Sequence, residues 1–139
     1  MGILNQLKKE ELDSEQVIKA LSEGTIRVSE KINGKWVVNT EIKTAILDSF
    51  VKRKSKIMTG DNTHYYDKFG CLYSDSNSLE HFRDFNMRIL PGAVIREGSY
   101  IGKNTIIMPS FINIGAYIGD HTMIDTWSTV GSCAQIGKH

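Results

Sequence analysis

From residue 94 onward the sequence repeats with a period of six residues. Read in blocks of six, the first position is Val or Ile in seven of eight cases: Val94, Tyr100, Ile106, Ile112, Ile118, Ile124, Val130 and Ile136. The fifth position is small in six of seven cases: Gly98, Asn104, Ser110, Ala116, Thr122, Ser128 and Ala134. Neither a helix nor a strand has this period, so the repeat constrains the fold more than any other feature.

A parallel β-helix of triangular cross-section accounts for the period. Each block supplies one flat side and one corner, and three blocks close a coil, so residues 18 apart stack at the spacing of paired strands, about 4.8 Å. We expect the first and fifth positions of each block to point into the prism. Tyr100 and Asn104 depart from the pattern, as residues of terminal repeats often do.

Composition divides the chain near residue 90. Only six of the 33 charged residues follow Leu90, whereas both prolines and seven of the 12 glycines do. We therefore expect an α+β domain over residues 1–90 and a β-helix over residues 91–139. The repeat itself, residues 94–136, corresponds to about 2.4 coils at 18 residues per coil.

The first domain shows helix and hairpin signals. Asp13 or Ser14 is expected to cap a helix that ends near Gly24, and Thr40 a second helix. Asn33 and Gly34, between apolar stretches, predict a hairpin turn because both residues tolerate positive φ. The apolar faces of the two helices are Val17, Ile18 and Leu21, and then Ile42, Ala45, Ile46 and Phe50. Residues 57–88 are rich in aromatic side chains, which are expected to pack.

Charge and cysteine content exclude several classes of protein. A formal net charge of +1 argues against a nucleic-acid partner. No stretch approaches the roughly 20 apolar residues that span a bilayer, which argues against a membrane partner. The two cysteines, Cys71 and Cys133, are too few for a disulfide framework, so a reduced, cytoplasmic protein is expected.

The run MPSFINIGAYIGDHTMIDTWSTVGSCAQIGK, residues 108–138, resembles the tetrahydrodipicolinate N-succinyltransferases of the bacterial diaminopimelate–lysine pathway. The segments GTIRVSEKINGKWVVN and RILPGAVIREGSYIGKNTIIMPS resemble the same family, so the similarity begins near Ile18. The resemblance implies a left-handed β-helix and a homotrimer with active sites between neighbouring subunits. It implies an acyltransferase that moves the succinyl group of succinyl-CoA, a co-substrate rather than a bound cofactor, to the amino group of tetrahydrodipicolinate. It also implies a longer enzyme, of which this chain is the N-terminal part.

Two residues match the acceptor site of that family. Arg88, in NMRILPG, matches an arginine that binds the acceptor, and a guanidinium suits a dicarboxylate because it can form two parallel bonds to a carboxylate. Asp125, in MIDTW, matches the active-site acid, which can orient the amine and take its proton. Spacing alone would make Arg88 a surface cation and Asp125 a corner residue. The residues that bind CoA are expected mostly beyond His139.

Other reactive residues have simpler interpretations. Cys133 has no evident base, and direct attack by an amine needs no acyl-enzyme, so we expect it to be a bystander. Trp127 and Met123 are expected to make packing or trimer contacts. His121 and His139 are 18 residues apart and should stack on successive coils, but no metal site is expected. Two alternatives remain: a metal-dependent hydratase like the γ-class carbonic anhydrases, and a non-catalytic β-helix that serves only in assembly.

Overall fold

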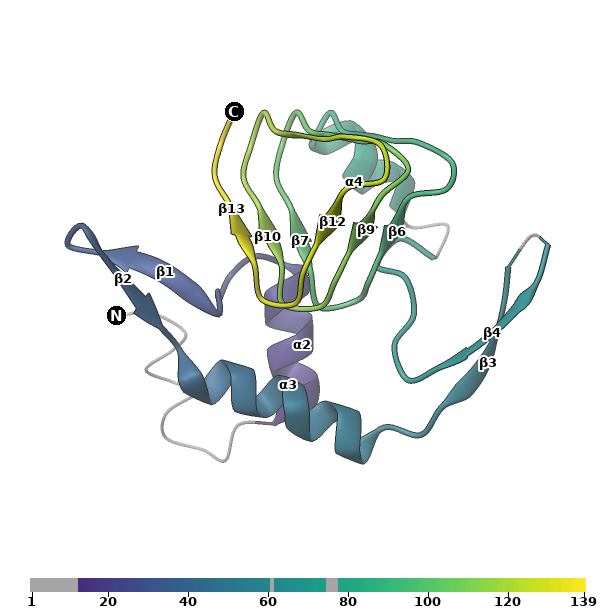
Figure 1. Cartoon of the computed structure of the whole chain (residues 1–139), viewed down its shortest axis with the longest axis horizontal. Coiled ribbons are helices and arrows are strands. Elements are labelled where there is room, and N and C mark those ends of the chain that lie inside the picture. The colour runs from purple at the N-terminus through teal and green to yellow at the C-terminus, as the bar shows by residue number, and fades with distance from the viewer. Residues whose placement is uncertain (1–12, 61, 75–77) are drawn as a thin grey trace.

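The computed structural model describes residues 13–60, 62–74 and 78–139. The N-terminal part is built from helices and two hairpins, with the hairpins on opposite sides of the molecule (Figure 1). Its elements are α2 (Ser14–Ser22), β1 (Ser29–Ile32), β2 (Lys35–Val38), α3 (Thr40–Lys52), β3 (Lys56–Thr59), β4 (His64–Asp67) and α4 (Ser78–Asp84). Within the described residues, no helix is long and apolar enough to cross a membrane.

Short parallel strands form the rest of the described chain. They are β5 (Arg88–Ile89), β6 (Val94–Ile95), β7 (Tyr100–Ile101), β8 (Ile106–Ile107), β9 (Phe111–Ile112), β10 (Tyr117–Ile118), β11 (Met123–Ile124), β12 (Thr129–Val130) and β13 (Gln135–Ile136). They pair into three sheets, in the orders β11-β8-β5, β12-β9-β6 and β13-β10-β7, so that successive coils stack. The predicted fold class, an α+β region followed by coils of a parallel β-helix, is confirmed.

The residues that point into the prism differ from the prediction in the first coils. Ile95, Ile101 and Ile107 are buried there, whereas Val94 is exposed and Tyr100 and Ile106 are only half-buried. From Ile112 onward the predicted first position is correct. The same shift explains why Tyr100 and Asn104 depart from the repeat, because Ile101 and Thr105 are the residues that point inward there.

One corner is a residue short, and this causes the shift. Four residues separate β5 from β6 and β11 from β12, but only residues 108–110 separate β8 from β9. Strand partners whose connecting chain includes this corner are therefore 17 residues apart, as in Ile107 with Ile124. Partners before and after it, such as Ile89 with Ile107 and Ile112 with Val130, are 18 apart. The long corners contain a residue with positive φ, Gly92 or Trp127. The short corner contains Pro109, whose ring fixes φ near −65° and excludes that conformation.

The other corners share one design. The third residue of each has positive φ, and the fourth is small and points inward. The positive-φ residues are Gly98, Asn104, Gly115, His121 and Cys133. Cys133 thus occupies a turn position. His121 and His139 stack as expected, with ring centroids 5.2 Å apart.

Helices α2 and α3 form where the sequence predicted them, whereas α4 was not predicted. The carboxylate of Asp13 accepts a hydrogen bond from the backbone N–H of Glu15 and caps α2. Helix α3 begins at Thr40, but the cap position is Asn39 rather than Thr40. The apolar faces of α2 and α3 are buried against each other, apart from the half-buried Phe50, which packs at the edge.

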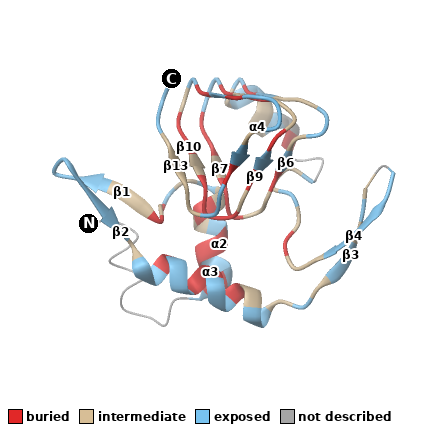
Figure 2. Cartoon of the chain, in the orientation of Figure 1, coloured by how far each residue is buried: buried red, intermediate tan, exposed pale blue. Residues whose placement is uncertain are grey.

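The two hairpins project from this core, and their side chains are largely exposed (Figure 2). Asn33 and Gly34 both have positive φ in the β1–β2 turn, as predicted. The expectation that the aromatic side chains of residues 57–88 pack is only partly correct. Phe69, Tyr73, Phe82 and Phe85 contact the cores, but Tyr65 and Tyr66 on β4 are exposed, because a two-stranded hairpin has no second layer to cover them.

The β-helix docks on the helices through one of its corners. Ile114 points outward from the corner between β9 and β10 and is buried in the core formed by α2 and α3. Gly98, on the coil before it, has φ +83°, and a Cβ there would come within 2.7 Å of the Ile114 side chain. The Gly98 N–H donates to the Ser22 hydroxyl at the end of α2. Only glycine fits this contact.

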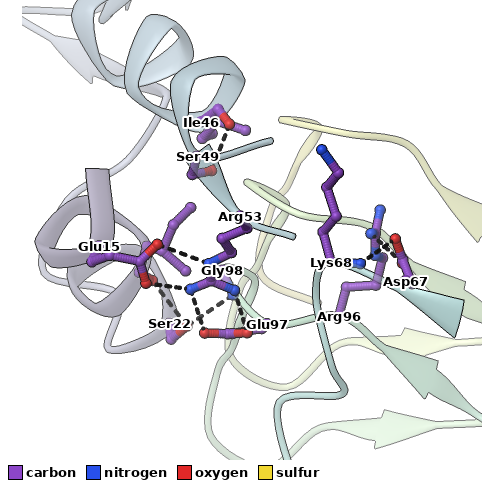
Figure 3. Close-up of polar contacts among 11 residues, drawn as sticks. Glu15, Ser22, Ile46, Ser49, Arg53, Asp67, Lys68, Arg96, Glu97 and Gly98 are labelled. Carbon is purple, nitrogen blue, oxygen red and sulfur yellow. Dashed lines mark hydrogen bonds and ion pairs between the residues drawn. The ribbon is translucent and has the colours of Figure 1, made fainter. Parts of the chain in front are cut away.

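Arg53 adds a polar connection beside that corner (Figure 3). Its guanidinium donates two hydrogen bonds to Glu15 on α2, at 2.8 and 2.6 Å, and two to Glu97 of the β-helix, at 2.8 and 3.0 Å. It also lies 4.2 Å from the centroid of the Phe69 ring. These bonds lower the pKa of Glu15 below its ordinary value of 4.5. Arg53 therefore joins three segments of the chain.

A matched pair of substitutions tests which residues fill the prism. Ile95→Ala should lower the free energy of unfolding by about 2–5 kcal/mol, because it leaves a cavity in the core. Val94→Ala, at the adjacent exposed position, should cost less than about 1 kcal/mol. The measurement is urea-induced unfolding followed by circular dichroism. Equal losses would contradict the inward assignment of Ile95.

Replacing Arg53 tests the polar connection. Arg53→Met should lower the free energy of unfolding by about 1–3 kcal/mol, since it leaves two carboxylates without their partner. Lys54→Met, at an exposed neighbour, is the control and should have little effect.

The effect should also depend on pH. Glu15 has a lowered pKa in the folded state, so its contribution is present above pH 4.5 and is lost as the pH falls through the lowered value. The difference between the wild-type chain and Arg53→Met should therefore shrink in acid. A difference independent of pH would show that Arg53 acts through packing alone.

Candidate functional site

Arg88 and Asp125 lie on the outer face of the same sheet. Arg88 belongs to β5, where its N–H donates to the carbonyl of Thr105 on the next coil. Its side chain is exposed, since the alternate residue Ile89 faces inward. Among the described residues the Arg88 guanidinium has no ion-pair partner. It is therefore available to bind an anion.

A pocket of about 470 Å³ lies beside Arg88 at the first coil. It is mainly apolar, and its lining includes Cys71, Tyr73, Phe82, Leu90 and Pro91. An apolar pocket with one cation at its edge suits a small carboxylate with a hydrocarbon body.

Tyr73 is the main polar side chain of this pocket besides Arg88. Its hydroxyl lies 3.3 Å from Nε2 of His81 on α4. Burial raises the pKa of Tyr73 well above its usual range, so the phenol stays protonated. Burial also lowers the pKa of His81, which favours the neutral ring. The pair thus adds hydrogen-bonding groups without adding charge.

Asp125 directly follows β11, and its carboxylate is exposed. One oxygen, Oδ1, accepts a hydrogen bond from the N–H of Thr126 at 2.7 Å. This bond fixes the orientation of the carboxylate and leaves its second oxygen for another donor. An oriented, solvent-accessible carboxylate can accept a proton from a bound amine.

The structure places Arg88 and Asp125 on one face but not in contact. Strand β8 lies between β5 and β11, so their strands are about 10 Å apart. The pocket beside Arg88 does not include Asp125. Trp127 and Met123, near Asp125, are 85% and 58% exposed. Arg88 and Asp125 therefore do not share a pocket within one chain.

The remaining reactive residues do not form a centre. No three His, Cys, Asp or Glu side chains lie close enough to hold a metal ion anywhere in the described part of the chain, so the hydratase alternative gains no support. Cys133 is half-buried, and burial raises the pKa of its thiol. Asp120 accepts hydrogen bonds from Lys138 and from the N–H of Lys103, so its role is to hold coils together.

Comparison with known proteins shows which sequences this chain is similar to. Residues 5–51 match the family model described as "Tetrahydrodipicolinate N-succinyltransferase N-terminal". The match ends before the stacked coils begin, so it concerns the N-terminal part of the chain alone.

Curated relatives narrow the assignment. The chain is 48% identical over 124 residues to the 2,3,4,5-tetrahydropyridine-2,6-dicarboxylate N-succinyltransferase of Sodalis glossinidius, covering 89% of this chain and 45% of the relative. The Buchnera aphidicola protein of the same name is 50% identical over 124 residues, with the same coverage. The Acinetobacter baylyi protein is 45% identical over 125 residues, covering 90% and 45%. The chain is thus a homologue of the N-terminal part of these enzymes and spans less than half their length.

Sequence reasoning missed the pocket beside Arg88. Most of its lining comes from residues 71–93, which precede the six-residue repeat and show no periodic pattern, so the sequence does not indicate Tyr73 as a site residue. It also missed Arg53, whose two carboxylate partners, Glu15 and Glu97, are far from it in the sequence. Density of aromatic residues was the one signal for the pocket, and it did not indicate which side chains would meet.

Thiol labelling tests the assignment of Cys133 to a turn. At pH 7, a maleimide should modify the exposed Cys71 at least tenfold faster than Cys133, because the thiolate is the reactive form and burial disfavours it. Mass spectrometry of the labelled peptides measures both rates. Cys71→Ser provides a chain with Cys133 alone. Rapid labelling of Cys133 in that variant would contradict its bystander role.

Proposed function

We propose that this chain is the acceptor-binding part of an N-succinyltransferase. The reaction transfers the succinyl group of succinyl-CoA to the amino group of ring-opened, hydrated tetrahydrodipicolinate. The products are N-succinyl-2-amino-6-oxopimelate and CoA, in the diaminopimelate route to lysine, and the expected location is the cytoplasm. The observation that carries the proposal is an arginine with no ion-pair partner among the described residues, together with an oriented carboxylate on the same face. The chain is 45–50% identical to enzymes of that name.

Arg88 is proposed to bind a carboxylate of the acceptor. Its guanidinium can donate two parallel hydrogen bonds, which fix both position and orientation. The apolar pocket beside it offers room for the carbon chain of the acceptor. Binding at Arg88 directs the acceptor along the outer face of the sheet, toward β11.

Asp125 is proposed to act as the general base. The neutral amine attacks the thioester carbonyl of succinyl-CoA, and Asp125 takes the proton that the nitrogen loses. The tetrahedral intermediate then collapses, the C–S bond breaks and CoA leaves as its thiolate. No acyl-enzyme is needed, which agrees with the structural position of Cys133.

A homotrimer is proposed because one chain supplies only one wall. Asp125 stands on a corner of the prism, where solvent would compete with substrate. A neighbouring subunit facing Met123 and Trp127 would enclose the acceptor and bury both side chains. Most contacts to succinyl-CoA are expected from residues beyond His139.

Turnover tests this proposal in an extended chain. The extension joins residues 1–139 to the part of the Sodalis glossinidius relative that follows its aligned region. CoA should be released from succinyl-CoA only when the acceptor is present. Asp125→Asn should reduce turnover at least 100-fold, as expected for loss of a general base, while acceptor binding persists. Arg88→Met should weaken acceptor binding at least tenfold.

Asp48→Asn is the control, since Asp48 is an exposed carboxylate on α3, far from the site. It should leave turnover and binding unchanged. Full activity of Asp125→Asn would remove Asp125 from the mechanism. A folded oligomer without turnover or acceptor binding would favour the non-catalytic assembly role instead.

A further inference from the structure

The β1–β2 hairpin exposes more apolar surface than a free hairpin should. Trp36 is 60% exposed and Val38 57%, and Ile32 and Val37 on the opposite face are also open. Two-stranded hairpins are marginally stable in water, so exposed apolar residues on both faces are costly. Contiguous exposed apolar residues of this kind mark an interaction surface.

The base of the hairpin is fixed to the most C-terminal of the described coils. Arg27, two residues before β1, donates through Nε to the Gln135 side chain on β13 at 2.9 Å. Its guanidinium lies 3.7 Å from the centroid of the Tyr117 ring on β10. The Asn39 side chain, at the end of the hairpin, donates to the Arg27 carbonyl at 2.8 Å. These contacts set the direction of the hairpin relative to the sheet.

The hairpin projects toward the side on which successive coils of the β-helix are added. In Figure 1 the strands β7, β10 and β13 succeed one another toward the side from which β1–β2 projects, whereas β3–β4 projects from the other side. Strand β13 is an edge strand of its sheet, so its outer backbone groups are open to pairing. A fourth strand would lie about 4.8 Å further along, toward the side from which the hairpin projects (Figure 1).

We propose that the β1–β2 hairpin packs against a further hexapeptide coil, stacked on β11, β12 and β13, and stabilises it. The occupant is the polypeptide that follows the matched region in the relatives, of which this chain covers 44–45%. Residues 18 positions after Gln135 would continue the sheet and place an outward side chain next to Trp36 or Val38. The proposal rests on homology to the N-terminal part of these enzymes and not on the proposed succinyl transfer.

Trp36 itself reports on the contact. The chain has two tryptophans, so Trp127→Phe leaves Trp36 as the sole emitter. Acrylamide should quench Trp36 strongly in the 139-residue chain and at least threefold less in the extended chain described above. Equal quenching in both would overturn the proposal.

A pair of charge substitutions tests the same surface energetically. Val38→Asp should lower the thermal midpoint of the extended chain by several degrees and that of the 139-residue chain by far less. Val51→Asp is the matched control, because Val51 is 82% exposed on α3. It should affect both chains slightly. Equal sensitivity to Val38→Asp in both chains would contradict packing of the hairpin against a further coil.

A shorter extension provides a second test if the extended chain does not fold. Repeating residues 122–139 once after His139 adds 18 residues, or one coil in register. Shielding of Trp36 there supports the proposal, and unchanged quenching overturns it. Light scattering on the 139-residue chain tests whether a second copy of the chain covers the hairpin instead. Concentration-dependent dimerisation that shields Trp36 would assign the hairpin to a second copy and overturn the proposal.

Discussion

The contact between Ile114 and the two helices is the interaction on which the rest of the structure depends. Helices of the length of α2 and α3 are marginal in isolation, and the hairpins contribute little cover. By sending Ile114 outward from a β-helix corner into their core, the chain gives the helices a rigid partner. Gly98 and Arg53 serve the same junction, one by allowing close approach and the other by bridging two carboxylates.

The architecture could be predicted from the sequence because the six-residue period survives in almost every block. Which residues of the first coils point inward could not be predicted, since Val94, Tyr100 and Ile106 are each followed by Ile. Either residue of such a pair could fill the prism, and the short corner at Pro109 decides which one does. The hairpin at Asn33 and Gly34 was predictable from its turn. The β3–β4 hairpin was not, because its aromatic residues suggested burial, and a two-stranded hairpin has no second layer to bury them.

The candidate site was less accessible to pattern reasoning. Arg88 and Asp125 have no distinguishing spacing and were singled out only by resemblance. The structure adds two observations that the resemblance lacked. Among the described residues the Arg88 guanidinium has no ion-pair partner and lies at the edge of an apolar pocket, and the Asp125 carboxylate accepts a hydrogen bond from the N–H of Thr126. The structure also places one strand, β8, between β5 and β11, so a substrate that contacts both residues must lie across the outer face of the sheet.

The short corner at Pro109 bears on how β-helices of this kind change length during evolution. Strands and inward positions are constrained by stacking on both neighbours, but a corner can lose its positive-φ residue without disturbing either flank. Coil length is therefore set corner by corner. An alignment that assumes a uniform 18-residue step would place Ile106 opposite Ile124 and misread every outward position before it. Insertions and deletions are best sought, and best engineered, at these corners.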